Sequence, residues 1–513
     1  MKLLYPIMGL TIAPLISCNA NKEEPKHDSP NIVYVFPDQM RNHAMEFWGE
    51  DSFSESVRFK PDPVITPNLN EFARESAVFT NALSNCPLSG PHRGMLFTGM
   101  YPQNNGVSLN PNSLRPISSL REDVTAWSDV FSHEGYSCGY IGKLHLDFPT
   151  PTDPENPGHY VEDKKPVWDT YTPPERRHGF DYWYSYGTFD EHKNPHYWDK
   201  DGKKHEPKEW SPKHEADMAI AYLKNDSKQR DSNKPFFLVV GMNPPHSPYQ
   251  SLDDAMEDDY NLYKDRSKSE LLIRPNADTT MAKAAAAPYY FANVTGVDRE
   301  FGRILDALKE LGLDENTIVV FSSDHGETMC SQGIQDPKNS VYTESMNVPF
   351  LIRYPEKIKP KIVDGLFSTV DIMPTLLGAA NLKSKIPSSV QGKDYSDALL
   401  LDGSSTKFDD AVLYIRNING ETDREGKVTS YFPESRGIKT KDYTLALTIN
   451  KETNELTEVL FFNDKEDPYQ LNKLKLEDFP GQKEVLLTQL GVLLKETIDP
   501  WYEDKILSDL IPY

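Results

Sequence analysis

Short apolar runs rich in β-branched residues alternate with helical segments along most of this chain, starting at Asn31. Residues 32–36, 236–240 and 317–321 are typical of parallel strands buried on both faces. A further strand is expected at residues 350–352. The expected helices lie at residues 68–76, 124–134, 214–223, 282–311 and 371–379. This alternation predicts the α/β fold class, with a large, mostly parallel central sheet flanked by helices.

The pattern changes after a stretch rich in Ser, Gly and Lys at residues 384–405. Strand-like runs then follow one another without helices between them, and a last helix is expected near residues 483–498. These runs lie at residues 411–415, 436–440, 443–448 and 458–462. We therefore predict a large domain at residues 30–404 and a smaller C-terminal domain at residues 405–513, with an antiparallel sheet and a terminal helix.

Charge and cysteine content limit the possible partners. Acidic side chains outnumber basic ones by 78 to 55, and the net charge is −23 at pH 7. A nucleic-acid-binding protein would carry a clustered basic surplus, so we expect no nucleic-acid partner. Cys86, Cys138 and Cys330 do not have the spacing of metal ligands. They are expected to be buried thiols, although one disulfide is compatible with an oxidising compartment.

Polar residues follow two of the predicted strands at the point where each strand ends. Asp38 and Gln39 come directly after the first strand, and Asp324 and His325 follow the third. In sheets of this kind, reactive groups lie at the carboxyl ends of the strands. Carboxylate and amide oxygens favour Ca²⁺ or Mg²⁺, and His325 is a further possible ligand. A single Asp at a strand end is more often a turn or cap residue, so the hypothesis depends on the segment between the two pairs.

That segment contains residues 89–99, which read SGPHRGMLFTG. They resemble the signature of the type I sulfatases, members of the alkaline phosphatase superfamily. The family pattern is Cys or Ser, any residue, Pro, any residue, Arg, with Thr-Gly a fixed distance beyond. Counting from Ser89 brings Arg93 and Thr98-Gly99 into register, whereas counting from Cys86 does not. The resemblance therefore implies a Ser-type sulfatase, although His92 stands where a small residue is common.

In this family the signature Cys or Ser is oxidised to formylglycine after translation. The resemblance thus implies a formylglycine-generating maturase as partner, with Ser89 as its target, and a hydrated aldehyde as the nucleophile. It also implies one Ca²⁺ ion, which would favour an ionised hydroxyl. The implied metal ligands are Asp38, Gln39, Ser89, Asp324 and His325. A helix expected to start just after Pro91 would point its N–H groups at the sulfate.

Three further segments match the family in order: residues 142–145 (GKLH), residues 243–248 (NPPHSP), and Lys338 with the residues after it. The resemblance assigns sulfate binding to the two lysines, while the signature Arg would hold the nucleophile or the sulfate. His145 would take a proton from the diol, and His246 would protonate the departing sugar oxygen. The implied catalytic residues are Ser89, Arg93, Lys143, His145, His246 and Lys338.

Two departures from the family pattern concern the metal ligands. Many members carry Asp-Asp and Asp-Asn where this chain has Asp38-Gln39 and Asp324-His325. Fewer anionic ligands imply weaker Ca²⁺ binding, and the pairing resembles carbohydrate sulfatases of gut and marine Bacteroidetes. Residues 368–375 also match a family stretch, in which Asp371 is expected to cap a helix. Residues 461–468 resemble the strand and turn of the family's terminal domain.

The substrate prediction depends on residues 178–198, which are dense in aromatic side chains and include His192, Lys193 and His196. Aromatic faces with hydrogen-bonding tips suit a sugar ring, although a packed surface loop would look the same. The resemblance suggests a sulfated glycan of the host, and 6-O-sulfated N-acetylglucosamine is the favoured substrate. The alternatives are galactose or N-acetylgalactosamine 6-sulfate, or another glycosaminoglycan sulfate.

The N-terminal 18 residues are expected to lie outside the fold. An apolar run at residues 3–16 is too short to span a membrane, which needs about 20 residues, and is typical of a secretory signal. It ends in Leu-Ile-Ser-Cys18, which resembles the lipobox of bacterial lipoproteins. Residues 19–29 form a polar tether that resembles a surface-export signal. We predict an outer-membrane lipoprotein in the periplasm or on the cell surface, anchored through Cys18; an ordinary secretory signal is the alternative.

Two other functions compete with a sulfatase. A phosphomonoesterase, phosphodiesterase or phosphonate hydrolase of the same superfamily would often keep an unmodified nucleophile and bind a metal pair through more His and Asp. The separate lysines Lys143 and Lys338 favour the sulfatase. A glycan-binding lipoprotein without activity is disfavoured because no expected catalytic position is missing.

Overall fold

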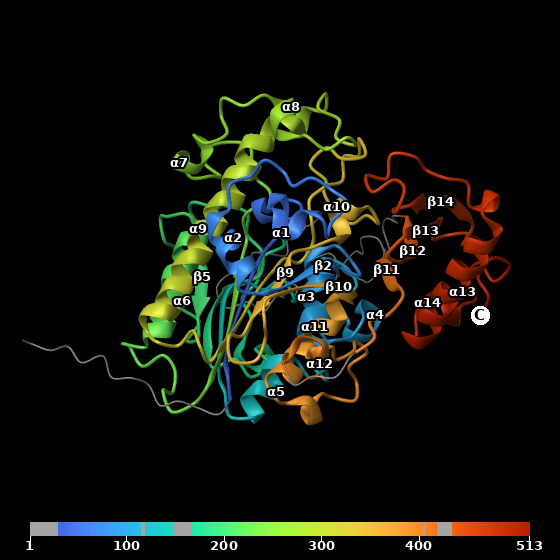
Figure 1. Ribbon diagram of the computed structural model, residues 1–513. Helices are drawn as coiled ribbons and strands as arrows, with labels where there is room; N and C mark the ends of the chain where they lie inside the picture. Colours follow the sequence, from blue (N-terminus) through green and yellow to red (C-terminus); the bar gives the residue numbers. More distant parts are fainter. Residues whose placement is uncertain are drawn as a thin grey trace, which may run out of the picture.

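The computed structural model describes residues 29–113, 118–147, 149, 167–401, 403, 406–417 and 433–513. Its centre is a 10-stranded sheet with the order β10-β2-β9-β8-β1-β7-β3-β4-β5-β6 (Figure 1). The strands are β1 (Asn31–Pro37), β2 (Ala77–Leu83), β3 (Ser137–Lys143), β4 (Tyr182–Tyr186), β5 (Tyr197–Asp199), β6 (Lys204–His205), β7 (Phe236–Met242), β8 (Thr317–Ser322), β9 (Phe350–Arg353) and β10 (Lys361–Ser368). The predicted α/β fold with a mostly parallel sheet is confirmed.

The middle of the sheet is parallel and fully buried. β8, β1, β7 and β3 are neighbours, and Ile32 of β1 pairs with Phe237 on one side and with Ile318 on the other. All residues of these four strands are buried, which explains the nearly continuous apolar sequences of β1, β7 and β8. β9 runs antiparallel to both of its neighbours, β2 and β8. The carboxyl ends of β8, β1, β7 and β3 therefore lie side by side at one edge.

Alternate residues of the central strands face two separate cores. Val33 and Val35 pack with α2 (Pro67–Arg74), α6 (Ser211–Lys224) and α9 (Ala287–Glu310) on one face. Ile32 and Tyr34 pack with α3 (Ser89–Thr98), α5 (Trp127–His133) and α11 (Thr369–Ala379) on the other. Figure 1 shows these helices on the two sides of the sheet. The strand period of two thus produces a three-layered domain.

The start of α11 differs from the prediction. Ser368, not Asp371, is the N-cap residue, and Asp371 lies in the first turn of the helix. The Asp371 carboxylate accepts hydrogen bonds from the backbone N–H of Ser368 at 2.9 Å and from its hydroxyl at 2.8 Å. This is a capping-box arrangement, in which the acidic residue reaches back to the cap.

The C-terminal sheet is antiparallel and contains β11 (Val412–Arg416), β12 (Glu434–Lys439), β13 (Tyr443–Ile449) and β14 (Leu456–Asn463). The terminal helix α13 (Pro480–Glu496) contacts β11 and β12. Leu445 and Leu490 share a core with Met95 of α3. The small sheet therefore supports the helix that carries the sulfatase-like signature. This confirms the predicted antiparallel sheet with a terminal helix.

Short helices occupy many of the connections. They are η1 (Glu46–Gly49), α1 (Asp51–Ser54), α4 (Pro102–Asn105), η2 (Pro174–Arg176), α7 (Glu257–Tyr260), α8 (Lys268–Leu271), η3 (Ala282–Ala286), α10 (Thr343–Met346), η4 (Lys383–Lys385), α12 (Ser396–Leu399), η5 (Leu476–Asp478) and α14 (Pro500–Glu503). Among the described helices, none is both long enough and apolar enough to cross a lipid bilayer. The predicted signal at residues 1–18, most of the tether at residues 19–29, and the domain boundary at 404/405 lie outside the described residues.

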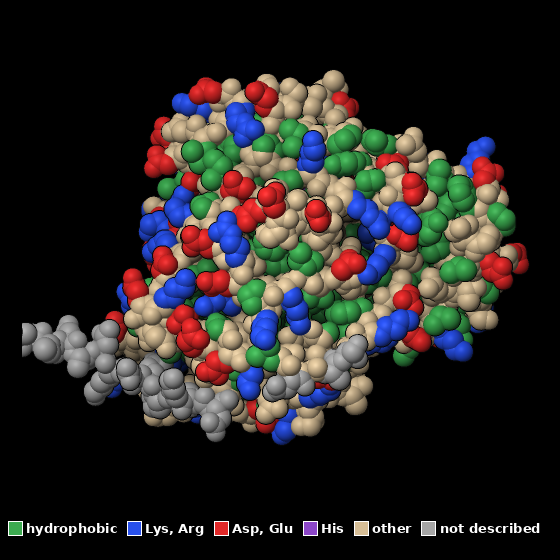
Figure 2. Space-filling model, in the orientation of Figure 1, with side chains coloured by type: hydrophobic (Ala, Val, Ile, Leu, Met, Phe, Trp, Pro, Cys, Tyr) green, Lys and Arg blue, Asp and Glu red, His purple; other side chains and the backbone are tan. Residues whose placement is uncertain are grey.

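Cys86, Cys138 and Cys330 are free thiols and are buried, as one of the two sequence interpretations predicts. The acidic surplus is spread over the surface. Figure 2 shows Lys and Arg side chains interspersed with Asp and Glu over the visible face.

Candidate active site

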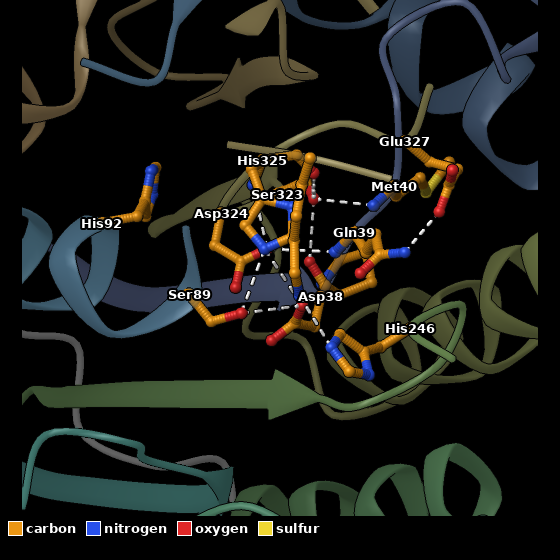
Figure 3. Close-up of polar contacts among 12 residues, drawn as sticks. Asp38, Gln39, Met40, Ser89, His92, His246, Ser323, Asp324, His325 and Glu327 are labelled. Atoms are coloured by element: carbon orange, nitrogen blue, oxygen red, sulfur yellow. Dashed lines mark hydrogen bonds and ion pairs between the residues drawn. The ribbon is translucent and has the colours of Figure 1, made fainter. Parts of the chain in front are cut away.

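Four neighbouring strands place polar side chains at one edge of the sheet (Figure 3). Asp324 and His325 follow β8, and Asp38 and Gln39 follow β1. His246 lies in the loop after β7, and β3 ends at Lys143, with His145 just beyond it. Because parallel strands end at the same edge, residues up to 287 positions apart in the sequence, 38 and 325, are brought together.

Helix α3 brings Ser89 to this edge in its first turn. The helix begins at Ser89 itself, not after Pro91 as predicted. The Ser89 hydroxyl donates a hydrogen bond to Asp38 Oδ1 at 3.2 Å, and Ser89 Oγ is also 3.0 Å from His325 Nε2. Ser89 is only 1% exposed. The following residue, Gly90, lies against Pro111, where a Cβ would approach Pro111 Cδ to 2.8 Å. Glycine therefore allows the close approach that seats the helix N-terminus.

Asp38, Asp324 and His325 form a buried group of potential metal ligands, whose atoms all lie within 4.8 Å of one another. The ring Nδ1–H of His325 donates to the carbonyl of Gly326 at 3.0 Å, so the Nε2 lone pair faces the two carboxylates. Burial lowers the pKa of His325 to about 3, and Lys338 adds to this effect. Burial and the neighbouring Asp38 raise the pKa of Asp324 to about 7. The His325 lone pair and the two carboxylates repel one another. A divalent cation bound between them would remove this repulsion.

Gln39 lies beside this group, because its backbone N–H donates a hydrogen bond to Asp324 Oδ1 at 3.0 Å. Its side-chain Oε1 is buried and accepts no hydrogen bond within the described part of the chain. The amide Nε2 donates instead to Glu327. Two carboxylates, an amide oxygen, an imidazole nitrogen and the Ser89 hydroxyl together fit a hard divalent cation such as Ca²⁺. The residues predicted as metal ligands are thus assembled in one place.

Positive side chains surround the same carboxylates. Arg93 is fully buried, and its Nη2 lies 3.2 Å from Asp38 Oδ2 and 3.4 Å from Asp324 Oδ2. Lys143 Nζ lies 2.9 Å from Asp38 Oδ2 and donates to Asn243 Oδ1 at 3.0 Å. Burial alone would raise the pKa of Asp38, but the charges of Lys143 and Arg93 hold it well below its usual range. The site can therefore hold several anionic groups at close quarters.

Three predicted catalytic residues remain, namely Lys338 and the imidazoles of His145 and His246. His246 Nε2 accepts a hydrogen bond from Lys338 Nζ at 2.8 Å. Burial, followed by the charges of Lys338 and Lys143, lowers the pKa of His246 well below its usual value. Burial, followed by Lys143 and Arg93, does the same for His145. Both imidazoles are therefore neutral in the ligand-free site.

A cavity of about 520 Å³ opens next to these groups. Its lining includes Lys143, His145 and His246, together with the aromatic side chains of Trp168 and Phe189. The remaining lining residues are Asn110, Val167, Asp169, Thr188 and Asp190. Its volume is in the range of sites for small ligands. The cavity therefore leaves room for a small ligand beside three of the predicted catalytic residues.

The aromatic stretch at residues 178–198 contributes less to this cavity than predicted. Tyr197 and Trp198 are buried in the core, whereas Thr188, Phe189 and Asp190 line the cavity. His192 Nε2 lies 2.9 Å from the carbonyl oxygen of His246 and so supports that loop. His196 pairs with Asp169 at 2.6 Å. Trp168, which is 37% exposed at the cavity wall, was missed because it is an isolated aromatic residue in a Pro-rich segment.

A buried serine at a helix N-terminus, a buried group of potential metal ligands and a set of cationic side chains lie at the carboxyl edge of a parallel sheet. Together they define an alkaline phosphatase-like hydrolase for an anionic ester. The sequence comparisons identify the family. The Sulfatase family model matches residues 30–382, and the model "N-sulphoglucosamine sulphohydrolase, C-terminal" matches residues 332–496. The chain therefore belongs to the sulfatase family.

Two relatives and one solved structure are informative. An endo-4-O-sulfatase of Bacteroides thetaiotaomicron is 60% identical over 98% of this chain and 100% of its own length. An N-acetylglucosamine-6-O-sulfatase of the same species is 26% identical over 96% of this chain and 90% of its own. A structure from a study of glycosaminoglycan metabolism in that species has a TM-score of 0.92 at 61% identity, covering 95% of this chain and 100% of that one. The protein is thus a sulfuric ester hydrolase of the carbohydrate sulfatase type.

Proposed function

We propose that the protein removes 4-O-sulfate groups from glycosaminoglycans and that it acts on internal sugars of the polysaccharide. The observation that carries this proposal is the 60% identity to an endo-4-O-sulfatase over 98% of the chain. The sequence alone favours 6-O-sulfated N-acetylglucosamine, but the relative named for that substrate is only 26% identical. We therefore replace the 6-O-sulfated substrate with a 4-O-sulfated one.

We further propose that Ser89 is converted to formylglycine by a maturase and that one Ca²⁺ ion is held by Asp38, Gln39, Asp324, His325 and residue 89. The hydrated formylglycine would supply the nucleophilic hydroxyl, and the cation would stabilise its ionised form. The position of Ser89 supports this, because its hydroxyl is already within hydrogen-bonding distance of Asp38 and His325. The unpartnered oxygen of Gln39, within the described residues, supports a cation at the same place.

The chain's own cations would bind the sulfate. Arg93 and Lys143 both contact Asp38 Oδ2, and Lys338 Nζ lies 2.8 Å from His246 Nε2. Their positive charges would neutralise sulfate oxygens as negative charge moves to the leaving group. His145 has no hydrogen-bond partner for either ring nitrogen within the described residues, so it is available to take a proton at the nucleophile.

His246 would give a proton to the departing sugar oxygen. It is neutral in the ligand-free site, since burial and Lys338 lower its pKa. A bound sulfate monoester brings negative charge beside the imidazole, and this raises the pKa of His246. Substrate binding would thus favour the protonated imidazole that acts as the acid. The positive charge of Lys338 would then be shared between the imidazole and the sulfate.

We also retain the proposal of a lipoprotein anchored through Cys18 on the periplasmic or outer surface of an outer membrane. The sequence Leu15-Ile16-Ser17-Cys18 supports it. Metabolic labelling with a radioactive fatty acid tests this proposal. Wild-type protein should incorporate the label, and Cys18→Ser should not.

The function is tested with 4-O- and 6-O-sulfated glycosaminoglycan oligosaccharides of equal length and a co-expressed maturase. We expect sulfate release from internal 4-O-sulfated residues, and mass loss of two hydrogens at the peptide that carries Ser89. Ser89→Ala should abolish both, whereas Cys86→Ala, a matched change at a buried neighbour, should retain both. Preferential release of 6-O-sulfate would contradict the 4-O assignment, and full activity of Ser89→Ala would contradict the nucleophile.

A further inference from the structure

The side chain of Gln39 is held in one of two possible orientations. Its backbone has φ = 65°, and its N–H donates to Asp324 Oδ1 at 3.0 Å. Its carbonyl accepts a hydrogen bond from the Tyr290 hydroxyl at 3.0 Å. The backbone is therefore fixed from both sides, but an amide group can still rotate by half a turn and exchange its oxygen and nitrogen. A cation requires the oxygen.

Glu327 decides between these orientations. It is fully buried, and its Oε2 accepts hydrogen bonds from Gln39 Nε2 and from the Tyr249 hydroxyl, the latter at 2.8 Å. Its Oε1 accepts from the backbone N–H of Met329 at 2.7 Å and lies 3.9 Å from Lys283 Nζ. A carboxylate only accepts, so the amide nitrogen of Gln39 must face Glu327. The rotated amide would place two acceptor oxygens against each other in a buried site.

The result is that Gln39 Oε1 points away from Glu327 and stays without a hydrogen-bond donor among the described residues. Figure 3 shows Gln39 between Glu327 and the group formed by Asp38, Asp324 and His325. A buried carbonyl oxygen without a donor costs free energy unless something positive occupies the space beside it. The orientation that Glu327 enforces is thus the orientation that a cation uses.

The same carboxylate connects three loops of the active-site edge. Gln39 follows β1, Glu327 lies three residues after Asp324 beyond β8, and Tyr249 lies three residues after His246 beyond β7. One buried acceptor therefore holds the metal-ligand loop against the loop of the proposed acid. Its hydrogen-bond donors Gln39 and Tyr249 follow β1 and β7, and the same two strands carry Asp38 and His246 at their ends.

We propose that Glu327 is a positioning residue that fixes the Gln39 amide with its oxygen toward the bound cation. This positioning role rests on the proposed function, because it requires a cation between Asp38, Asp324 and His325. Partners of metal ligands commonly contribute about 10–100-fold to metal affinity, because they orient the ligand before the metal arrives.

The test measures Ca²⁺ binding by calorimetry to Ca²⁺-depleted protein made without a maturase, so that activity plays no part. Glu327→Gln keeps the size of the side chain but cannot accept hydrogen bonds on both sides. We expect its Ca²⁺ affinity to fall about 10–100-fold. The matched control is Glu215→Gln. Glu215 is another fully buried side chain that accepts a hydrogen bond from a tyrosine hydroxyl, that of Tyr197, and it makes no hydrogen bond to Asp38, Asp324 or His325 among the described residues. Its Ca²⁺ affinity should equal that of the wild type.

A double mutant separates positioning from simple loss of negative charge. Gln39→Met removes the ligand, and if Glu327 acts through Gln39, the pair of changes should cost no more than Gln39→Met alone. Additive losses would show that Glu327 acts by its charge and would overturn the proposal. If Glu327→Gln does not fold, Glu327→Asp, which keeps the charge but withdraws it by one methylene group, is measured in its place and should lose affinity.

The outcomes are distinct. Wild-type affinity of the Glu327 variant that is measured would overturn the positioning role and leave the proposed function intact. Absence of Ca²⁺ binding to the wild type would overturn the positioning role together with the Ca²⁺ part of the proposed function. Weakened binding by the Glu327 variant, unchanged binding by Glu215→Gln and no further loss in the double mutant would establish it.

Discussion

Replacing Arg93 by Met tests whether the buried charges are paired as the structure shows. The guanidinium is fully buried, and it neutralises Asp38 and Asp324 at 3.2 and 3.4 Å. Removing one partner of a buried ion pair typically costs about 3–5 kcal/mol, because the other charge stays buried. Asp38 keeps Lys143 at 2.9 Å, so we expect the lower end, about 3 kcal/mol.

The backbone contact of Arg93 adds little to this cost. Its Nη1 donates to the carbonyl of Lys143 at 2.6 Å, but that carbonyl also accepts a hydrogen bond from the Tyr140 hydroxyl. It therefore stays satisfied when Arg93 is lost. With an unfolding entropy of about 2.1 cal/mol/K per residue, a chain of this size loses about 1 °C per kcal/mol, so Arg93→Met should lower the melting temperature in EDTA by about 3–4 °C. Saturating Ca²⁺ should recover more of the stability in the variant than in the wild type, because the cation replaces the missing charge.

Differential scanning calorimetry with EDTA and then with Ca²⁺ measures both effects. The matched control is Arg74→Met, since Arg74 pairs with Glu50 at 2.7 Å while 55% of its side chain is exposed. Exposed pairs contribute about 0–1 kcal/mol, so the control should melt close to the wild type. Equal melting temperatures of the two variants in EDTA, or equal increments on adding Ca²⁺, would refute the pairing of Arg93 with the two carboxylates.

Three further changes have distinct outcomes. Trp168→Ala removes an aromatic wall of the cavity and should raise KM for an oligosaccharide about 2–10-fold, while kcat/KM for a small aryl sulfate should hold; equal losses on both would contradict a sugar-binding role. Gly326→Ala would place a Cβ 1.9 Å from the Glu344 carbonyl oxygen and should abolish Ca²⁺ binding in calorimetry, whereas Gly312→Ala, with open space around it, should not. Burial raises the pKa of Asp298 from 3.8 to about 6, so the folded state holds this proton more tightly than the unfolded state. Stability is therefore lost as the pH rises from about 4 to about 6, by up to about 3 kcal/mol, and urea unfolding of Asp298→Asn should show a smaller loss across this range than the wild type.

The strand ends are the part of the site that could be predicted from the sequence. Buried parallel strands have continuous apolar sequences, so the first polar residues after them, such as Asp38 and Asp324, mark the edge where ligands bind. The signature beginning at Ser89 then connects to that edge through spacing within a single helix. Both signals are local in the sequence, and the structure brings them together within hydrogen-bonding distance.

The remaining features depend on contacts between distant segments. Glu327 has an ordinary position after a strand, and only the contacts with Gln39 and Tyr249 give it a role. The sequence suggests that the aromatic residues at 178–198 form a sugar-binding surface, but Tyr197 and Trp198 are buried in the core. Composition cannot separate these cases, because an aromatic side chain serves equally well in a core and in a binding wall.

The balance of charge at the site resolves how so acidic a protein can hold a sulfate. The net charge of −23 acts through exposed groups, whose influence fades over about 8 Å at physiological salt. Within the site, Arg93 and Lys143 are both occupied with Asp38, so the ligand-free pocket offers little positive charge that is not already paired. A divalent cation beside Asp38 and Asp324 would take over their neutralisation and leave the two side chains available to an anion. On this proposal, the potential metal ligands and the side chains proposed to bind sulfate act as one electrostatic unit, and the acidic surface would limit nonspecific binding of polyanions without opposing the binding of one sulfate group in the site.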